Sequence, residues 1–144
     1  MARRAGSVRR HSLQSQSSRK KGMTMSKAKI FKHSELTLKP SVTPTGTSSI
    51  ARVINAEISR TMGGGIEYLE NASIDWTVTY DEVLFIHEGT LTIELDDGRH
   101  ECRPGDIVWL PNGTHLKYIA TERTGYFYCL YPYDWAARQE TVEP

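Results

Sequence analysis

The sequence predicts an all-β domain built as a sandwich or a barrel. Nine short segments rich in β-branched and aromatic residues follow one another between positions 51 and 131, at the spacing typical of such folds. Residues that accept or preset turn geometry separate several of these segments. With 144 residues, of which 38% are hydrophobic, the chain has the size and composition of one domain with one core.

The predicted strands cover most of the domain. Within 90–95 polar and apolar residues alternate, so Leu91, Ile93 and Leu95 are expected to face the core. Turns are expected at Glu88-Gly89, Asp96-Asp97-Gly98, Pro104-Gly105 and Pro111-Asn112-Gly113. The predicted strands are 51–58, 65–69, 73–79, 82–87, 90–95, 99–103, 106–110, 115–120 and 125–131.

The segments around the strands are less regular. Residues 27–40 can form a short strand and turn, and 41–49 are expected to be a Thr/Ser/Pro loop. The triplet 63–65 is three glycines, interpreted as a flexible turn that could bring backbone amides near a ligand. Only 134–140 has a helical pattern, with Asp134 as its expected N-cap.

The chain is expected to have four parts, the first of which is marked by its charge. Residues 1–22 hold seven of the 18 basic residues and no acidic one. The rest of the chain therefore has a net charge of about −6, which does not favour binding to nucleic acid. Residues 1–24 are therefore interpreted as a disordered basic leader, or as a mis-assigned start because Met23 and Met25 come directly after the basic residues 1–22. The remaining parts are an N-terminal arm at 25–49, the folded domain at 50–137 and a C-terminal tail at 138–144.

Hydropathy and cysteine usage indicate a soluble cytoplasmic protein. No run approaches the roughly 20 apolar residues that span a bilayer, so no membrane association is expected. Cys102 and Cys129 belong to no CxxC pair and are expected to be free thiols, which fits a reducing compartment. His87 precedes a turn and is expected to be exposed.

Two motifs resemble those of the cupin superfamily. In Glu82-Val-Leu-Phe-Ile-His-Glu-Gly89 a glutamate precedes a turn glycine by seven positions, as at the end of the first cupin motif. Gly105-Asp-Ile-Val-Trp-Leu-Pro111-Asn-Gly113 resembles the second motif, and 15 residues separate the two. The resemblance implies a cupin double-stranded β-helix, also called a jelly-roll barrel, and a homodimer.

The same resemblance bears on metal binding. Metal-binding cupins carry histidines at the positions that here hold Trp76, Val78 and Leu116, so only Glu82 of the usual ligand set is present. A lone carboxylate cannot hold a divalent transition ion tightly. No cofactor is therefore predicted, and a divalent metal is disfavoured. His115 lies one residue before a ligand position and is expected to point outward, unless a bulge turns it into the cavity.

A closer resemblance is to the EutQ-like stand-alone cupins of ethanolamine utilization. The segments Trp76-Thr-Val-Thr-Tyr80-Asp81-Glu82 and Tyr131-Pro-Tyr-Asp-Trp135 are similar to that group. The resemblance implies a place in ethanolamine breakdown and a proposed acetate kinase activity. A shared barrel does not by itself transfer that activity.

A ligand cavity follows from the alternation of side chains along a strand. If the strand is regular, Trp76, Val78, Tyr80 and Glu82 share the face that looks into the barrel. Aromatic walls around one carboxylate suit a small polar organic ligand. The predicted ligand-binding residues are Trp76, Val78, Tyr118, Tyr126, Tyr128 and His115.

Two functions from different classes remain open. In the first, an apolar cavity raises the pKa of Glu82, which acts as a general acid or base with Tyr80 as the second catalytic residue. In the second, Glu82 only accepts hydrogen bonds that close the barrel, and the protein is a non-catalytic module that binds a metabolite. Metal-dependent lyase or dioxygenase chemistry is disfavoured by Trp76, Val78 and Leu116.

Overall fold

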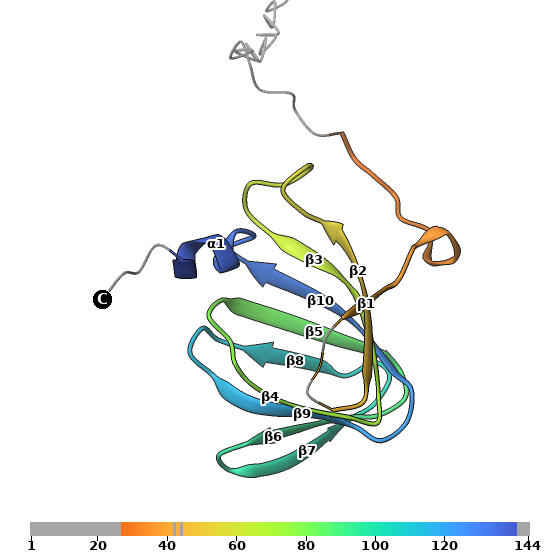
Figure 1. Ribbon diagram of the computed structural model, residues 1–144, viewed down its shortest axis with the longest axis vertical. Helices are drawn as coiled ribbons and strands as arrows, with labels where there is room; N and C mark the ends of the chain where they lie inside the picture. The colour runs from red at the N-terminus through yellow and green to blue at the C-terminus, as the bar shows by residue number, and fades with distance from the viewer. Residues whose placement is uncertain (1–26, 42, 44, 141–144) are drawn as a thin grey trace, which may run out of the picture.

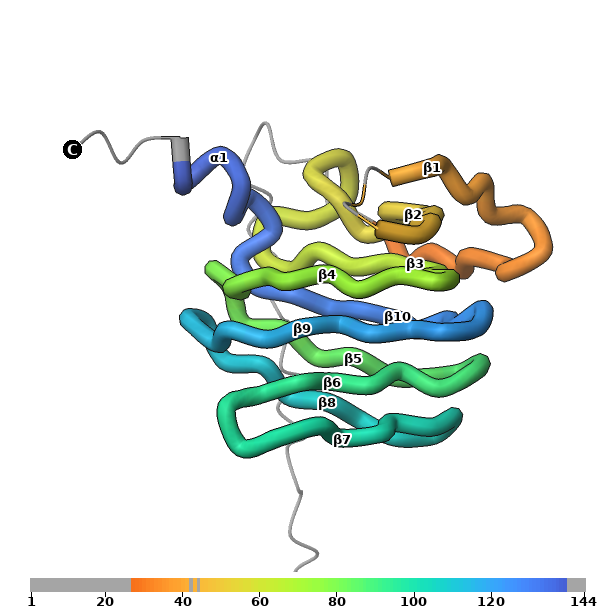
Figure 2. Tube along the Cα trace, turned by 60° about the horizontal axis from the view of Figure 1, so that its bottom comes forward, coloured from red at the N-terminus to blue at the C-terminus, as the bar shows by residue number. Residues whose placement is uncertain are grey.

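The computed structural model describes residues 27–41, 43 and 45–140. Within these residues, ten strands form two antiparallel sheets that face each other (Figures 1 and 2). One sheet has the order β1-β2-β3-β10-β5-β8, and the other has the order β4-β9-β6-β7. The elements are η1 (His33–Glu35), β1 (Lys39–Ser41), β2 (Thr47–Ile54), β3 (Gly63–Glu70), β4 (Ala72–Thr77), β5 (Asp81–Glu88), β6 (Leu91–Leu95), β7 (Gly98–Cys102), β8 (Ile107–Leu110), β9 (His115–Ala120), β10 (Thr124–Tyr131) and α1 (Trp135–Glu140).

All nine predicted segments form strands, and the predicted all-β jelly-roll barrel is confirmed. The largest boundary error is in β2, which begins at Thr47 inside the predicted loop and ends at Ile54. It ends there because the Asn55 side chain accepts a hydrogen bond from the Glu57 amide at 3.0 Å, which starts a turn. The helix begins at Trp135, directly after the predicted cap Asp134.

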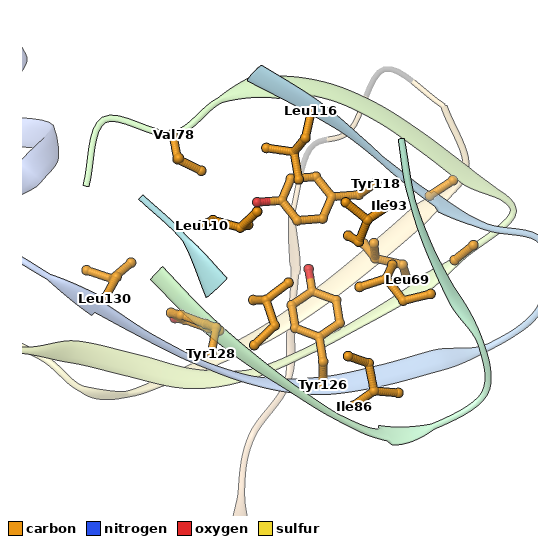
Figure 3. Packing of buried hydrophobic residues seen from close by; sticks show 14 of the residues in the cluster. Leu69, Val78, Ile86, Ile93, Leu110, Leu116, Tyr118, Tyr126, Tyr128 and Leu130 are labelled. Carbon is orange, nitrogen blue, oxygen red and sulfur yellow. The ribbon is translucent and has the colours of Figure 1, made fainter. Parts of the chain in front are cut away.

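The core lies between the two sheets. Leu91 and Ile93 are fully buried as predicted, and Leu95 packs against the same cluster. Figure 3 shows Tyr118 from β9 and Tyr126 from β10 reaching into this space from opposite sides. Cys102 and Cys129 are both free, as expected. Among the described residues, no helix is long and apolar enough to cross a membrane.

The three glycines lie inside β3, so the prediction of a flexible turn is wrong. A Cβ atom on Gly65 would lie 2.0 Å from the Ala51 carbonyl oxygen in β2, and one on Gly64 would lie 2.7 Å from the Tyr128 oxygen in β10. Glycine here permits a close approach of the neighbouring backbones rather than a turn.

The N-terminal arm packs on the outer face of the six-stranded sheet. His33 lies 2.7 Å from the Tyr68 hydroxyl, a hydrogen-bonding distance, and its ring centroid lies 6.2 Å from that of His87. His87 is therefore half-buried, and the prediction of an exposed side chain is wrong. Burial lowers the pKa of His87, with the Glu88 carboxylate opposing and His33 adding to this effect.

We predict that Gly65→Ala lowers the free energy of unfolding by more than about 2 kcal/mol, because the new methyl group must push β2 away from β3. Urea denaturation measures the change. The control is Ser73→Ala on the exposed side of β4, which should stay within about 0.5 kcal/mol of the parent protein. Equal stability of the two variants would contradict the close approach of the strands.

Candidate functional site

A cavity of about 600 Å³ opens between the sheets beside the start of α1. Its walls come from both sheets, because β2, β3, β5 and β10 of one and β4 and β9 of the other contribute side chains. The walls combine carboxylates with aromatic rings. The charged and aromatic lining residues are Arg52, Glu67, Trp76, Tyr80, Glu82, Tyr118, Tyr126, Tyr128, Tyr133, Asp134 and Trp135.

Glu82 projects from β5 into this cavity and is only 6% exposed. The Tyr118 hydroxyl of the facing sheet donates a hydrogen bond to Glu82 Oε2 at 3.1 Å. Burial raises the pKa of Glu82 from 4.5 to about 7, with the Tyr118 hydrogen bond opposing the shift and the Glu67 charge adding to it. The sequence-based expectation of a raised pKa at Glu82 agrees with this direction.

Glu67 is a second carboxylate in the cavity, and the sequence analysis missed it. Ser48 Oγ donates a hydrogen bond to Glu67 Oε1 at 2.8 Å, and the Tyr126 hydroxyl donates one to Oε2 at 2.8 Å. A signal was present, because Glu67 alternates with the buried Leu69 along a predicted strand and so shares its inward face.

An aromatic cluster closes one side of the cavity. Trp76 Nε1 donates a hydrogen bond to the Tyr80 hydroxyl at 3.2 Å. Trp135 at the start of α1 packs on both residues, with ring centroids 4.7 Å from Tyr80 and 6.2 Å from Trp76. Trp135 was not predicted as a site residue, because its position depends on how α1 folds back over the barrel.

The raised pKa values of the tyrosines keep their hydroxyls protonated. For Tyr118, Tyr126 and Tyr80 burial is the largest cause, and neighbouring carboxylates add to it. Burial also raises the pKa of Tyr128 to about 12, although the Arg52 charge opposes this. At neutral pH these hydroxyls therefore act as hydrogen-bond donors and acceptors rather than as bases.

The strand that was predicted to run regularly from Trp76 to Glu82 is interrupted, and the interruption removes Val78 from the cavity wall. The chain leaves β4 at Thr77 and enters β5 at Asp81, so it passes from one sheet to the other. Between them the Val78 backbone exchanges hydrogen bonds with Thr114 O and Gly113 N at 2.9 and 2.7 Å. Val78 is fully buried in the core and is not a lining residue, whereas Trp76, Tyr80 and Glu82 are.

His115 lies outside the cavity. Its side chain is 58% exposed and its Nε2 lies 2.7 Å from Asp75 Oδ1, whereas the next residue, Leu116, is buried in the core. β9 pairs with β4 in unbroken register from Ala72 to Thr77, so no bulge turns His115 inward. The expected outward orientation is thus what the strand adopts, and placing His115 among the ligand-binding residues is wrong.

The inward positions do not fit the three-histidine metal site of metal-binding cupins. Trp76 lies at the mouth, Val78 and Leu116 are buried, and Glu82 is held by a tyrosine hydroxyl. Within residues 27–41, 43 and 45–140, no group of three or more His, Cys, Asp or Glu side chains is placed to hold a metal ion.

Comparison with known proteins decides the family. The family model described as "Ethanolamine utilisation protein EutQ" matches residues 3–137. The chain belongs to the EutQ family. The EutQ-family assignment agrees with a relative named "Acetate kinase EutQ" from Clostridioides difficile (strain 630), which is 26% identical over 117 residues, or 81% of this chain and 74% of the relative.

Other EutQ-family members and cupins show how far the likeness extends. "Acetate kinase EutQ" of Escherichia coli (strain K12) is 25% identical over 83 residues, and the match spans 58% of this chain and 36% of that relative. The solved EutQ structure from Clostridium difficile has a TM-score of 0.61 and 26% identity, covering 66% of this chain and 69% of that chain. A cupin 2 conserved barrel domain protein from Rhodopseudomonas palustris shares the fold, with a TM-score of 0.59, 12% identity and coverage of 68% and 72%.

We predict that Glu82→Gln stabilises the protein at high pH and not at low pH. With a folded pKa raised from 4.5 to about 7, the parent protein loses stability as pH rises through this window, by about 3 kcal/mol above pH 8. Glutamine carries no charge to desolvate, so the variant should be more stable by about that amount at pH 8 and equal at pH 4.

Urea denaturation at the two pH values measures this difference. Glu101→Gln on the exposed face of β7 is the control and should show no such pH dependence. Equal stability of Glu82→Gln and the parent protein at pH 8 would mean that Glu82 is not desolvated.

Proposed function

We propose that this EutQ-family barrel binds a small polar organic metabolite in its cavity and that Glu82 acts there as a general acid or base. The observation that carries the proposal is a carboxyl group with a pKa of about 7 in the wall of a cavity of about 600 Å³. That volume lies in the usual range for small-molecule sites, about 300 to 1,000 Å³.

The hydrogen bonds around Glu82 support a role in proton transfer. A carboxyl group with a pKa near 7 is present in both forms at neutral pH, so it can accept a proton and return it. Tyr118 fixes Oε2, and Oε1 accepts no hydrogen bond among the described residues. Oε1 is also not a fully buried atom, so a ligand in the cavity can reach it. Tyr80 would orient the ligand through its protonated hydroxyl.

The names of the relatives suggest acetate kinase activity as a second function. Phosphoryl transfer relies on cations or backbone amides around the transferred group. The lining residues include one arginine, Arg52, beside the carboxylates of Glu67, Glu82 and Asp134. This charge balance favours metabolite binding over nucleotide binding, and an assay with ATP and acetate tests the alternative directly.

We predict that at least one member of a panel of small carboxylates, amines, phosphates and sugars raises the melting temperature of the protein. Conversion of each stabilising compound is then followed by NMR. Glu82→Gln should slow any conversion at least 100-fold, because a positioned acid or base contributes about 10² to 10⁴, while Glu101→Gln should not. Near-normal conversion by Glu82→Gln would refute the catalytic role, and recovery of the bound compound unchanged would leave a binding module.

We also propose that a second copy of the chain covers the apolar outer face of the six-stranded sheet. Two apolar rows cross this face, because Phe85 lies between Phe127 and Ile107, and Val83 lies between Cys129 and Trp109. Phe85, Ile107 and Trp109 remain 42%, 72% and 58% exposed, although a sheet face in water is normally polar.

The composition of the remaining chain favours a second copy as the occupant. Residues 1–26 hold seven basic residues and no Phe, Tyr or Trp, so they offer little apolar surface with which to cover this face. A second copy presents the same apolar rows, and a two-fold axis through the face would bury both.

We predict a dimer at about 10 µM in sedimentation equilibrium and a monomer for Trp109→Glu, because two buried carboxylates would face the partner's apolar rows. Ser73→Glu, on the exposed side of the other sheet, should remain dimeric. A monomeric parent protein would contradict the proposal.

A further inference from the structure

The cavity contains more negative than positive charge. Its charged lining residues are Arg52, Glu67, Glu82 and Asp134. Asp134 is neutralised by Arg138, whose Nε lies 2.7 Å from Asp134 Oδ1. Arg52 is exposed. Among the described residues, no Lys, Arg or His forms an ion pair with Glu67 or Glu82. The two inner carboxylates therefore lack a cation.

The hydrogen bonds of the cavity leave an acceptor, Glu82 Oε1, without a donor. Three hydroxyl groups already donate hydrogen bonds to carboxylate oxygens, namely those of Ser48, Tyr118 and Tyr126. The Trp76 N–H group donates its hydrogen bond to the Tyr80 hydroxyl. Glu82 Oε1 accepts nothing among the described residues, and it is not a fully buried atom. A ligand that binds the carboxylate form of Glu82 must therefore bring its own donors.

The aromatic wall suits a positive charge. Trp76, Tyr80 and Trp135 line the same cavity as Glu82, and the Trp135 ring centroid lies 4.7 Å from that of Tyr80 and 6.2 Å from that of Trp76. Ring faces carry negative potential and attract ammonium groups, most strongly where water is excluded. An anion would meet the same rings and two carboxylates, and it would have Arg52 as its single cationic partner in the wall.

We propose that the cavity selects a ligand with a primary ammonium group, which donates a hydrogen bond to Glu82 Oε1 and lies against the rings of Trp76, Tyr80 and Trp135. The inference rests on the proposed metabolite-binding function and names its ligand class. A primary ammonium supplies N–H donors and the missing positive charge together. The Tyr80 and Tyr128 hydroxyls, which donate to no described residue, are free to bind a second polar group of the ligand.

Ligand binding is then linked to the protonation of Glu82. A neighbouring ammonium favours the carboxylate form and lowers the pKa of Glu82, opposing the effect of burial. Near pH 7, where Glu82 is about half protonated, binding should release up to about half a proton for each ligand. A neutral ligand that merely fills the cavity would not release it.

The test compares three probes of nearly equal size, n-propylammonium, propionate and 1-propanol, by NMR titration of the full chain at pH 8 up to about 50 mM. We expect propylammonium to bind at least tenfold more tightly than either of the others, and at least tenfold more weakly at pH 5.5 than at pH 8. Calorimetry in two buffers of different ionisation enthalpy measures the released proton.

Three variants assign the effect to the named groups. Glu82→Gln should weaken propylammonium binding at least tenfold, and the matched Glu101→Gln should leave it unchanged. Trp76→Leu, at a side chain that is 39% exposed and so tolerant of change, should weaken propylammonium severalfold and leave 1-propanol unaffected. Trp76→Leu separates loss of the ammonium contact from any structural disturbance that the change at Glu82 causes.

The outcomes separate this inference from the function on which it rests. Propionate or 1-propanol binding more tightly than propylammonium, in a manner that depends on Trp76 and Glu82, would overturn the ammonium preference and leave the metabolite cavity in place. Propylammonium binding that Glu82→Gln does not weaken would overturn the preference as well. Failure of all three probes and of the wider panel would overturn both proposals.

Discussion

The burial of Glu82 between two sheets is the constraint on which the site depends. A carboxyl group that is 6% exposed needs hydrogen-bond donors, and Tyr118 from the opposite sheet provides one. The same requirement recurs at Glu67, which Ser48 and Tyr126 hold. Glu82 therefore fixes the Tyr118 side chain across the interior, whereas Glu67 holds side chains from the two neighbouring strands of its own sheet. The space left between these hydrogen-bonded pairs is the cavity.

Glycine at the start of β3 makes this arrangement sterically possible. Gly64 and Gly65 bring β3 close to the backbones of β2 and β10, where side chains would collide. Glu67 and Tyr126 lie opposite one another in the β3–β10 register, so a close and regular pairing of these strands sets the 2.8 Å hydrogen bond between them. The geometry of the site thus depends on how closely these strands pack, and a change at Gly65 should affect both.

The two faces of the six-stranded sheet carry different side chains. Its inner face presents Glu82, Leu84 and Ile86 to the interior, whereas its outer face presents Val83, Phe85 and His87. The N-terminal arm covers the end near His87 through His33 and Tyr68. Farther along that face lie the two apolar rows that contain Phe85 and Val83. The residues of the proposed metabolite site and those of the proposed interface between copies therefore alternate along one strand.

The strands, the barrel and the carboxylate of Glu82 could be predicted from the amino-acid sequence. Strand periodicity and turn residues are local properties, so nine strands and the inward orientation of Leu91 and Ile93 could be predicted. The alternation rule also placed Tyr80 and Glu82 in one wall, and it turned His115 outward. Where the rule failed, at Val78, the chain changes sheets, which no local pattern signals.

Which side chains meet depends on the tertiary structure and could not be predicted. Glu67 became a site residue because β10 brings Tyr126 opposite it, and Trp135 did so because α1 folds back over Tyr80. The triple glycine was misinterpreted for the same reason, since its function is to admit backbones from β2 and β10 that are remote in sequence. Contacts between distant segments depend on sheet order and register, and these are properties of the packed barrel rather than of any short stretch of sequence.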